Sequence, residues 1–370
     1  MKPKREIVEE NLLEQFREIR PHIPSRDHQA ISHYKDGTFG LSSLGFALYS
    51  NGHSLRGQSK TRPYGLIFES EDTMFSIGYY RKEQDSAESD GHVFIVAPRG
   101  DKVIEEVKRL TKSVLNSSLP CRGVYARFLT VDQYKQLLSD GFLPAKEAPW
   151  HEDSPEEDET LTSSLVRLED IVDSQSQIRV LPYGSRNSRK KSRMTYQRFR
   201  NFLDKNCLEY DLRDFSAENS EVAKRIIQDH FDTLREEGNQ IGSIPEDHFN
   251  SCDSEIIKLP SVITQIGYLG NLPVSYFSGE IVSDSRLALY TPFTLRSPEL
   301  VLPKIGKDVK AKEGFSAISM FAYLELLRKL KDKGIKEVLF GGSEHRDLNR
   351  IKRQFGCRND PSYWAVKLKT

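Results

Sequence analysis

The chain has 370 residues, of which 37% are hydrophobic and 10% aromatic, enough apolar material for two folded cores, which excludes disorder throughout. Lysine plus arginine and aspartate plus glutamate number 54 each, so no overall basic charge marks a nucleic-acid-binding protein, and any such contact must be local. The four cysteines are far apart and lack the spacing of a metal site or a disulfide framework. Because the sequence shows neither a signal peptide nor an apolar run near about 18 residues, we expect a soluble, cytoplasmic protein with no transmembrane segment and no metal.

The first half of the chain opens with a charged segment of helical pattern and then alternates strand and helix patterns. The helix extends to about Arg20, and its apolar face is expected to pack on the first domain. From residue 64 the order is three strands, a helix, a strand, a helix and a strand. The strands are expected at residues 65–69, 74–80, 92–97, 123–128 and 163–168, and the helices around residues 103–114 and 132–139.

Two charged segments separate the halves. Residues 151–159 are acidic and are most simply a solvated loop. Residues 186–200 contain seven cations, interleaved with aromatic side chains that could stack on nucleic-acid bases or dock a helix on the core. A solvated helix face balanced by the acidic loop is an equally weighted alternative. If nucleic acid binds here, the candidate residues are Arg189, Lys190, Lys191 and Arg193.

The second half repeats the order of the first. A helix with an apolar face at residues 222–234 leads into strands at residues 262–269, 272–282 and 286–295, joined by tight turns. A loop then ends at Gly314, Phe315 and Ser316, and Ser316 is the expected N-cap of the next helix. A short buried strand at residues 336–340, a charged helix at 346–355 and a last strand at 363–368 follow.

Because the same order of elements occurs twice, we expect two copies of one fold. The predicted fold class is α+β, with domains at residues 1–175 and 176–370 that each hold a mixed, mainly antiparallel sheet flanked by helices. The copies differ before the helix that follows the third strand. Asp101 in the first copy would repel an anion, whereas Gly314 to Ser316 in the second leave backbone N–H groups for a phosphate. We therefore place donor binding in the second copy.

Pro292 lies inside the third strand of the second copy, where it cannot donate a ladder hydrogen bond. A bulge or a splayed edge at this point would leave backbone groups free to contact an acyl carbonyl. With equal weight, Pro292 could simply mark the end of an ordinary strand.

Two segments near the C-terminus together resemble the closing signature of tandem proteins of the GNAT superfamily of N-acyltransferases. One is Gly-Gly-Ser-Glu at residues 341–344, and the other is Lys-x-x-Phe-Gly at residues 352–356. From residue 64 onward, the chain is similar to the C-terminal domain of phosphatidylglycerol lysyltransferases and, more distantly, to Fem-type peptidoglycan aminoacyl ligases. The resemblance implies two GNAT-like domains and transfer of an acyl or aminoacyl group to an amine or hydroxyl, from acyl-CoA in some members and aminoacyl-tRNA in others.

The donor loop departs from the acyl-CoA pattern of this family, Arg/Gln-x-x-Gly-x-Gly/Ala. Ala311 occupies the Arg/Gln position, and Ser316 occupies the last position, while Lys310 and Lys312 can supply positive charge. The departure raises the weight of an aminoacyl-tRNA donor without excluding acyl-CoA. Either would be a co-substrate, with no permanently bound cofactor, and the acceptor would be a small-molecule or peptide amine. The candidate donor-binding residues are Gly314, Phe315, Ser316 and Lys312.

Amide formation needs a neutral amine, a polarised carbonyl and a proton donor for the leaving atom. Glu344, at the end of a buried strand, is the candidate base, but it could equally cap the next helix. His345 beside it is a weaker candidate. The resemblance favours Lys352 for contact with the developing oxyanion or a phosphate, and a solvated lysine is the alternative. Tyr290 can donate a proton to the leaving group, although tyrosines on such strands are more often core residues.

Two classes of function are compatible with these residues. The first is an acyltransferase or aminoacyltransferase that uses aminoacyl-tRNA or acyl-CoA. The second is a non-catalytic tandem-GNAT binding or scaffold protein, which the altered phosphate loop allows. CoA or tRNA bound to the purified protein would support the first class.

Overall fold

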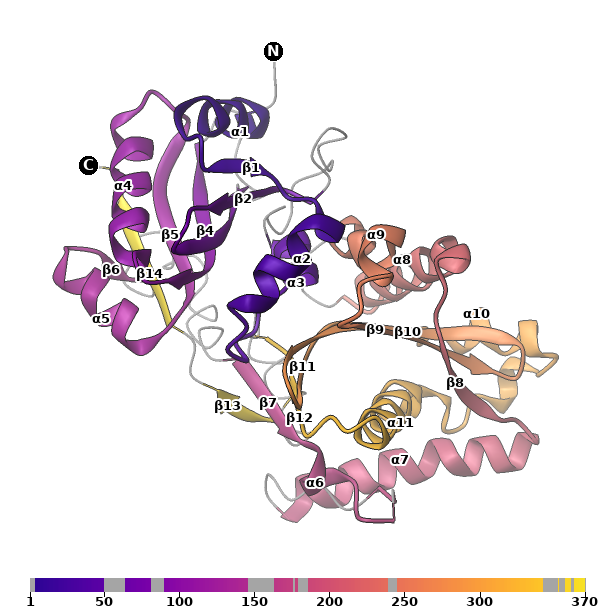
Figure 1. The fold of residues 1–370 in the computed structure, drawn as a ribbon. Helices are drawn as coiled ribbons and strands as arrows, with labels where there is room; N and C mark the ends of the chain where they lie inside the picture. Colours follow the sequence, from indigo (N-terminus) through magenta and orange to yellow (C-terminus); the bar gives the residue numbers. More distant parts are fainter. Residues whose placement is uncertain are drawn as a thin grey trace.

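The computed structural model contains a seven-stranded sheet in each half of the molecule (Figure 1). It describes residues 4–49, 64–80, 90–145, 163–175, 177–178, 186–238, 245–341, 352, 357–360 and 363–369. Sheet A consists, in spatial order, of β1 (Ile19–Pro21), β2 (Leu66–Glu69), β3 (Thr73–Tyr80), β4 (Gly91–Gly100), β5 (Cys121–Leu129), β14 (Tyr363–Leu368) and β6 (Leu143–Pro144). Sheet B consists of β13 (Arg358–Asp360), β7 (Ser163–Arg167), β12 (Glu337–Leu339), β11 (Arg286–Thr294), β10 (Leu272–Ser283), β9 (Val262–Leu269) and β8 (Tyr210–Asp214).

Both sheets are mixed and mainly antiparallel. β4 and β5 run parallel in sheet A, β11 and β12 run parallel in sheet B, and the other paired strands are antiparallel. Each parallel pair is connected through a helix, α4 (Val103–Asn116) or α11 (Ile318–Asp332), because parallel neighbours need a long crossover. The predicted α+β class, with two mixed sheets flanked by helices, is confirmed.

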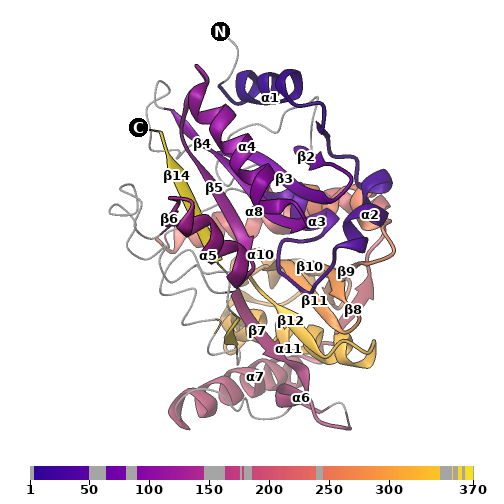
Figure 2. The same ribbon diagram turned by 60° about the vertical axis from the view of Figure 1, so that its left-hand side comes forward.

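The two halves exchange strands. β7, which we expected to complete the first copy, pairs with β12 and β13 of sheet B. β14, which we expected to complete the second copy, inserts between β5 and β6 of sheet A, and Figure 2 shows it beside β5. The predicted sheet membership of both strands is therefore wrong, and a boundary at residue 175 does not separate the two sheets. The sequence order of elements does not contain this information, because a terminal strand has the same pattern whichever sheet it joins.

Helices pack on both sheets. In sheet A, α4 places Val103, Val107, Leu110 and Val114 against the strands, as their helical spacing predicts. In sheet B, α11 covers one face and α8 (Ser220–Glu236) the other (Figure 1). No helix among the described residues is long and apolar enough to span a membrane. The remaining α-helices are α1 (Lys4–Gln15), α2 (Pro24–His33), α3 (Ser43–Tyr49), α5 (Val131–Ser139), α6 (Leu168–Ile171), α7 (Arg186–Asn206), α9 (Ser254–Ile257) and α10 (Pro298–Val301).

The inner faces of the two sheets share one core, which is built around α2, α3 and the residues between them. Phe39 and Leu44 pack in the same buried cluster as Phe128 of β5 and Tyr290 of β11. Residues 37–48 are almost entirely buried. The sequence pattern predicts no helix or strand here. Residues 34–42, which we call the linking segment, therefore connect the first half of the chain to the inner face of sheet B.

Candidate functional site

β11 and β12 diverge after a short stretch of pairing. The parallel register pairs Arg286, Leu287 and Ala288 of β11 with residues 337–339 of β12, and β11 continues to Thr294 after β12 has ended. We call this divergence the second splay. Beyond Ala288, the edge of β11 that faced β12 pairs with no other strand among the described residues.

A bulge and a proline mark this edge of β11. The register with β10 skips Tyr290, which forms a β-bulge. Leu295 N–H donates to Val274 O on β10 (2.7 Å). Because the backbone groups of successive strand residues point to alternate sides, those of Pro292, three residues earlier, point away from β10 and toward the splay. Proline leaves no unpaired N–H at that edge. The splayed edge expected around Pro292 is confirmed, and Pro292 does not mark the end of an ordinary strand, because β11 continues beyond it.

The turn before α11 differs from the expected N-cap. The helix begins at Ile318, and its N-cap is Ala317, preceded by a 3-10 turn over Phe315–Ala317. Ser316 is therefore not the N-cap, although it is exposed beside the helix start. Phe315 is fully buried and packs on α7, and Lys312 is exposed. Of the candidate donor-binding side chains, Ser316 and Lys312 are thus the accessible ones.

Gly314 is needed for a packing reason that the sequence did not show. Its φ is +88°, in the left-handed region, and a Cβ built there would lie 2.8 Å from Arg198 O of α7. The glycine therefore allows the turn before α11 to approach α7 closely. At the other side of this turn, Thr294 Oγ1 lies 2.5 Å from Ser319 Oγ in the first turn of α11. The end of β11 and the start of α11 are held together at the second splay.

Tyr290 is a buried residue with two polar partners from the first half of the chain. Its hydroxyl accepts a hydrogen bond from Gly40 N–H (3.2 Å) and lies 2.9 Å from Ser42 Oγ. Ser42 Oγ in turn accepts from Gly45 N–H (2.9 Å). The ring belongs to the shared core, as the more common interpretation of such tyrosines suggested. The backbone of Tyr290 nevertheless forms the bulge in β11, and its hydroxyl belongs to a chain of hydrogen bonds.

Lys352 is not a solvated lysine, because it is 9% exposed. Its ammonium donates to Phe340 O (3.0 Å) and Gly341 O (3.2 Å), directly after the end of β12. The lysine thus places a positive charge where β12 leaves the second splay. Glu344 and His345 lie outside the described residues, as does the helix predicted at residues 346–355 apart from Lys352.

The basic stretch forms α7, and its aromatic residues dock the helix. Phe199 is fully buried, and Tyr196 donates to Glu325 of α11 (2.7 Å). These rings therefore pack on the protein and are not available to stack on bases. Arg193, like Arg198 and Arg200, is exposed. The side chains of the other candidate nucleic-acid-binding residues lie outside what the structure describes, namely Arg189, Lys190 and Lys191.

The first half contains an equivalent divergence, between β4 and β5. Their parallel register ends at Val96 and Arg127, and we call the region beyond this pair the first splay. The next residues, Ala97 and Phe128, have φ values of 49° and 56°. Positive φ is costly for residues other than glycine, and such strain is held only where surrounding contacts enforce it.

Arg99 fills the first splay with hydrogen bonds. Its Nη1 donates to Pro98 O (2.8 Å) and Phe128 O (3.0 Å), which lie on the two diverging strands. Its Nε donates to Asp36 (2.6 Å) and its Nη2 to Thr38 (2.7 Å), both in the linking segment. Burial alone would raise the pKa of Asp36, but the charge of Arg99 lowers it below its ordinary value. Asp36 therefore stays ionised at neutral pH.

The two splays differ in what stands at equivalent positions. Arg99 is the third residue after the last ladder pair in β4, and the third residue after the last pair in β11 is Thr291. Thr291 is buried, and its hydroxyl faces Ser278 O at 3.4 Å. The long guanidinium of the first splay therefore has no counterpart at this position of the second. Arg99 was not predicted from the sequence. Asp101, on which the predicted difference between the copies depended, is exposed and precedes the Lys102 N-cap of α4.

A buried carboxylate that the sequence analysis also missed joins the linking segment to sheet B. Glu280 of β10 is fully buried and accepts hydrogen bonds from Ser261 Oγ (2.8 Å), Leu44 N–H (2.8 Å) and Lys35 Nζ (3.0 Å). His28 Nδ1 lies 3.6 Å from the same carboxylate. Burial lowers the pKa of His28, against the opposing attraction of Glu280. Only the folded structure brings these residues together, since more than 200 residues of sequence separate Leu44 from Glu280.

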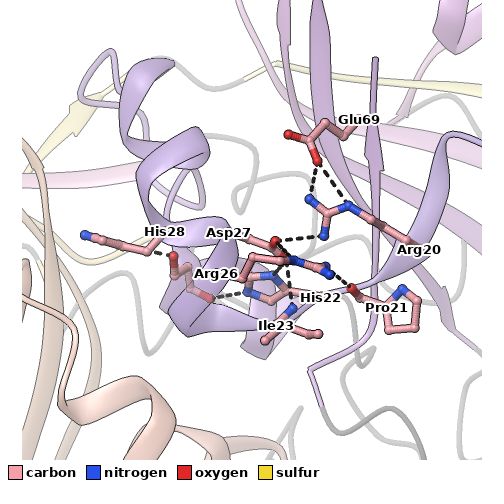
Figure 3. A network of polar contacts seen from close by, with 9 residues as sticks. Arg20, Pro21, His22, Ile23, Arg26, Asp27, His28 and Glu69 are labelled. Atoms are coloured by element: carbon pink, nitrogen blue, oxygen red, sulfur yellow. Dashed lines mark hydrogen bonds and ion pairs between the residues drawn. The ribbon is translucent and has the colours of Figure 1, made fainter. Parts of the chain in front are cut away.

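Helix α2, which precedes the linking segment, is anchored to the first half by a second buried carboxylate (Figure 3). Asp27 is 1% exposed, accepts from Arg20 Nη1 (2.7 Å) and lies 3.1 Å from His22 Nδ1. Arg20 also donates to Glu69 of β2 (3.0 Å). Burial alone would raise the pKa of Asp27, but hydrogen bonds from His22 and Arg26 lower it well below its ordinary value. The linking segment thus starts from a fixed point on sheet A.

Comparisons with known proteins show the fold. No family model matches the sequence, and no curated protein matches it significantly. FemX superposes with a TM-score of 0.55 at 10% identity over 95% of this chain and 97% of that chain. L-PGS from Bacillus licheniformis gives 0.53 at 12% identity over 95% and 93%. The C-terminal domain of a candidate lysylphosphatidylglycerol synthetase from Agrobacterium fabrum gives 0.51 at 10% identity over 94% and 91%. The resemblance recognised in the sequence therefore holds in three dimensions, and the chain has the fold of FemX and of these two synthetase structures.

Proposed function

We propose that the protein is an acyltransferase whose donor binds at the second splay. The observation that carries this proposal is the difference between the two splays: Arg99 fills the first, whereas the second has Thr291 at the equivalent position. The free edge of β11 and the start of α11 lie on either side of the second splay. An anionic group of the donor would find backbone N–H groups at the start of α11, and the acyl group would lie along the free edge of β11.

We further propose aminoacyl-tRNA as the donor in preference to acyl-CoA. The likeness of the fold to FemX and L-PGS supports a transferase of this kind, and the sequence lacks the Arg/Gln of the acyl-CoA loop. Exposed cations gather on α7 and on the loop before α11, which meet at the contact of Gly314 with α7. None of them forms an ion pair with another described residue. They are Arg193, Arg198 and Arg200 on α7, and Lys304, Lys310 and Lys312 on the loop.

The reaction joins an amine nitrogen to the donor carbonyl carbon and breaks the bond from that carbon to the ribose oxygen or the thiol sulfur. The amine loses a proton, and the leaving atom gains one. We assign Glu344 as the base, Lys352 as the cation near the developing oxyanion, and Tyr290 as the proton donor. Support for Tyr290 comes from its bond network, in which Ser42 Oγ lies 2.9 Å from its hydroxyl. Support for Lys352 comes from its buried ammonium at the end of β12.

The test is a salt titration of binding between the protein and a mixed aminoacyl-tRNA preparation. Phosphate contacts make log affinity fall linearly with log salt, and each cation removed flattens the slope by roughly 0.7 to 0.9. We therefore expect the triple variant Arg193→Ala, Arg198→Ala, Arg200→Ala to bind with a slope flatter by about 2 to 3. A matched control removes three exposed lysines from the first half, Lys108, Lys112 and Lys135, and should keep the wild-type slope.

The outcomes separate the candidate functions. A steep slope that flattens in the α7 variant alone supports the aminoacyl-tRNA donor. Equal flattening in both variants means that the contact is nonspecific and contradicts the proposed surface. Transfer from acyl-CoA to an amine without tRNA binding at low salt replaces the donor but keeps the acyltransferase. Binding without transfer from either donor favours a non-catalytic binding protein.

A further inference from the structure

The linking segment touches both splays. On one side, Asp36 and Thr38 accept hydrogen bonds from Arg99 in the first splay. Two residues farther on, Gly40 N–H donates to the Tyr290 hydroxyl at the second splay. A segment of only a few residues therefore joins a guanidinium of the first half to a candidate proton donor of the second.

Aromatic packing forms a second connection along the same path. The Phe39 ring lies 5.8 Å from the Phe128 ring of the first splay and 4.8 Å from the Tyr290 ring. A Cβ built on Gly341 would lie 2.5 Å from the Phe39 ring, so this ring also rests on the end of β12. Similarly, a Cβ on Gly40 would meet the Phe128 ring at 2.9 Å. The linking segment thus contacts both strands of the second splay and the strained Phe128 of the first.

We propose that Arg99 is a positioning residue for the site in the other half of the molecule. It occupies the first splay in place of a donor, holds Asp36 and Thr38, and through the linking segment fixes the Tyr290 hydroxyl and the Phe39 ring at the second splay. The first half is then an integral part of the site. This inference rests on the proposed function only for its effect on turnover, because the effect on Tyr290 can be measured without any substrate.

Two groups of contacts to Arg99 can be separated experimentally. The bonds to Pro98 O and Phe128 O hold the strands, whereas the bonds to Asp36 and Thr38 hold the linking segment. The double variant Asp36→Asn, Thr38→Val weakens the second group and leaves the first intact. Thr38→Ser keeps the hydroxyl and is the conservative comparison. Lys102→Ala is the matched control, because this exposed residue is paired with Asp72 near the first splay and does not touch the linking segment.

The first measurement is amide hydrogen exchange over residues 36–48, with α8 as the internal reference. In the double variant, we expect Gly40 and Gly45 to exchange faster by on the order of tenfold or more, because the bond from Arg99 to Thr38 is lost and the bond to residue 36 loses its ionised acceptor. The second is the carbon-13 resonance of the Tyr290 Cζ, assigned with Tyr290→Phe, which should shift in the double variant. Thr38→Ser and Lys102→Ala should match the wild type in both measurements. Where the protein transfers an acyl group, kcat should fall with KM unchanged.

Faster exchange at Gly40 together with a shifted Tyr290 resonance in the double variant, with Thr38→Ser unchanged from the wild type, supports the proposal. A folded double variant with wild-type exchange and resonance overturns it. If the double variant does not fold, the single variant Thr38→Val is judged by the same criteria. A wild type that transfers nothing from any donor removes the proposed function, while exchange and resonance still decide whether Arg99 positions Tyr290.

Discussion

His230 provides a pH-dependent test of how the second splay is held. This residue of α8 lies between aromatic rings, and its Nδ1 is 2.8 Å from Thr294 O at the end of β11. Burial lowers the pKa of His230 from 6.5 to about 4, and the charge of Arg296 adds to this effect. In the unfolded chain, the imidazole regains its ordinary pKa. Between these two values the unfolded state binds more protons, so stability is lost as the pH falls below 6.5 and levels off below about 4.

The size of the effect follows from the proton affinity. A tenfold change in proton affinity, which is one pKa unit, is worth about 1.4 kcal/mol. The lowered pKa of His230 therefore makes the free energy of unfolding about 3 kcal/mol smaller near pH 4 than above pH 7. We would measure urea unfolding of the wild type and of His230→Gln at half-unit steps from pH 8 to 4. The difference in unfolding free energy should be constant above pH 7 and shrink by about 1.4 kcal/mol per pH unit below 6.5. His33→Gln, an exposed histidine on α2, is the control. A difference that does not vary with pH would refute the assignment of a buried neutral imidazole.

Two further predictions concern packing between elements. Gly314→Ala should be less stable than Gly306→Ala in thermal unfolding. Both sites have positive φ, which destabilises an alanine by about 1 to 2 kcal/mol. Only at Gly314 does the added Cβ also meet a backbone atom, Arg198 O at 2.8 Å, whereas at Gly306 it has nothing within 4 Å. Equal losses would contradict the close approach to α7. Deleting residues 361–370 should increase hydrogen exchange across β5 more than across β9, because β14 pairs with β5 of sheet A. Preferential exchange in sheet B would contradict the strand exchange.

Local patterns predicted most helices and strands of the two halves, because each has a clear period. The spacing of Val103, Val107, Leu110 and Val114 predicts α4, and the turn at Gly270 predicts the β9–β10 hairpin. Sequence order could not assign β7 and β14 to their sheets, because pairing partners of a terminal strand depend on long-range packing. The linking segment was missed because its buried residues follow neither a helical nor a strand period.

The candidate site was only partly predictable. Pro292 indicated a splayed edge because the missing N–H restricts where proline can stand in a sheet. Gly314 was singled out as a donor-binding residue, whereas the structure shows its close contact with α7, which no local pattern predicts. Arg99 has no sequence signal beyond being a cation after a strand, since its role depends on Phe128 and on the linking segment. The assignment of Ser316 as N-cap failed because a 3-10 turn precedes α11.

The place of β14 in sheet A has a consequence for how the protein is made. Domains usually fold in order as the ribosome releases them, with the N-terminal unit first. Here β14 is synthesised after every strand of sheet B, yet it lies between β5 and β6, which are made before sheet B begins. The edge of β5 that pairs with β14 in the folded protein therefore stays unpaired while all seven strands of sheet B, β7 to β13, are synthesised. Such an edge is a template for pairing with other chains. We therefore expect misassembly to be most frequent before the ribosome releases β14, when this edge of β5 is still unpaired.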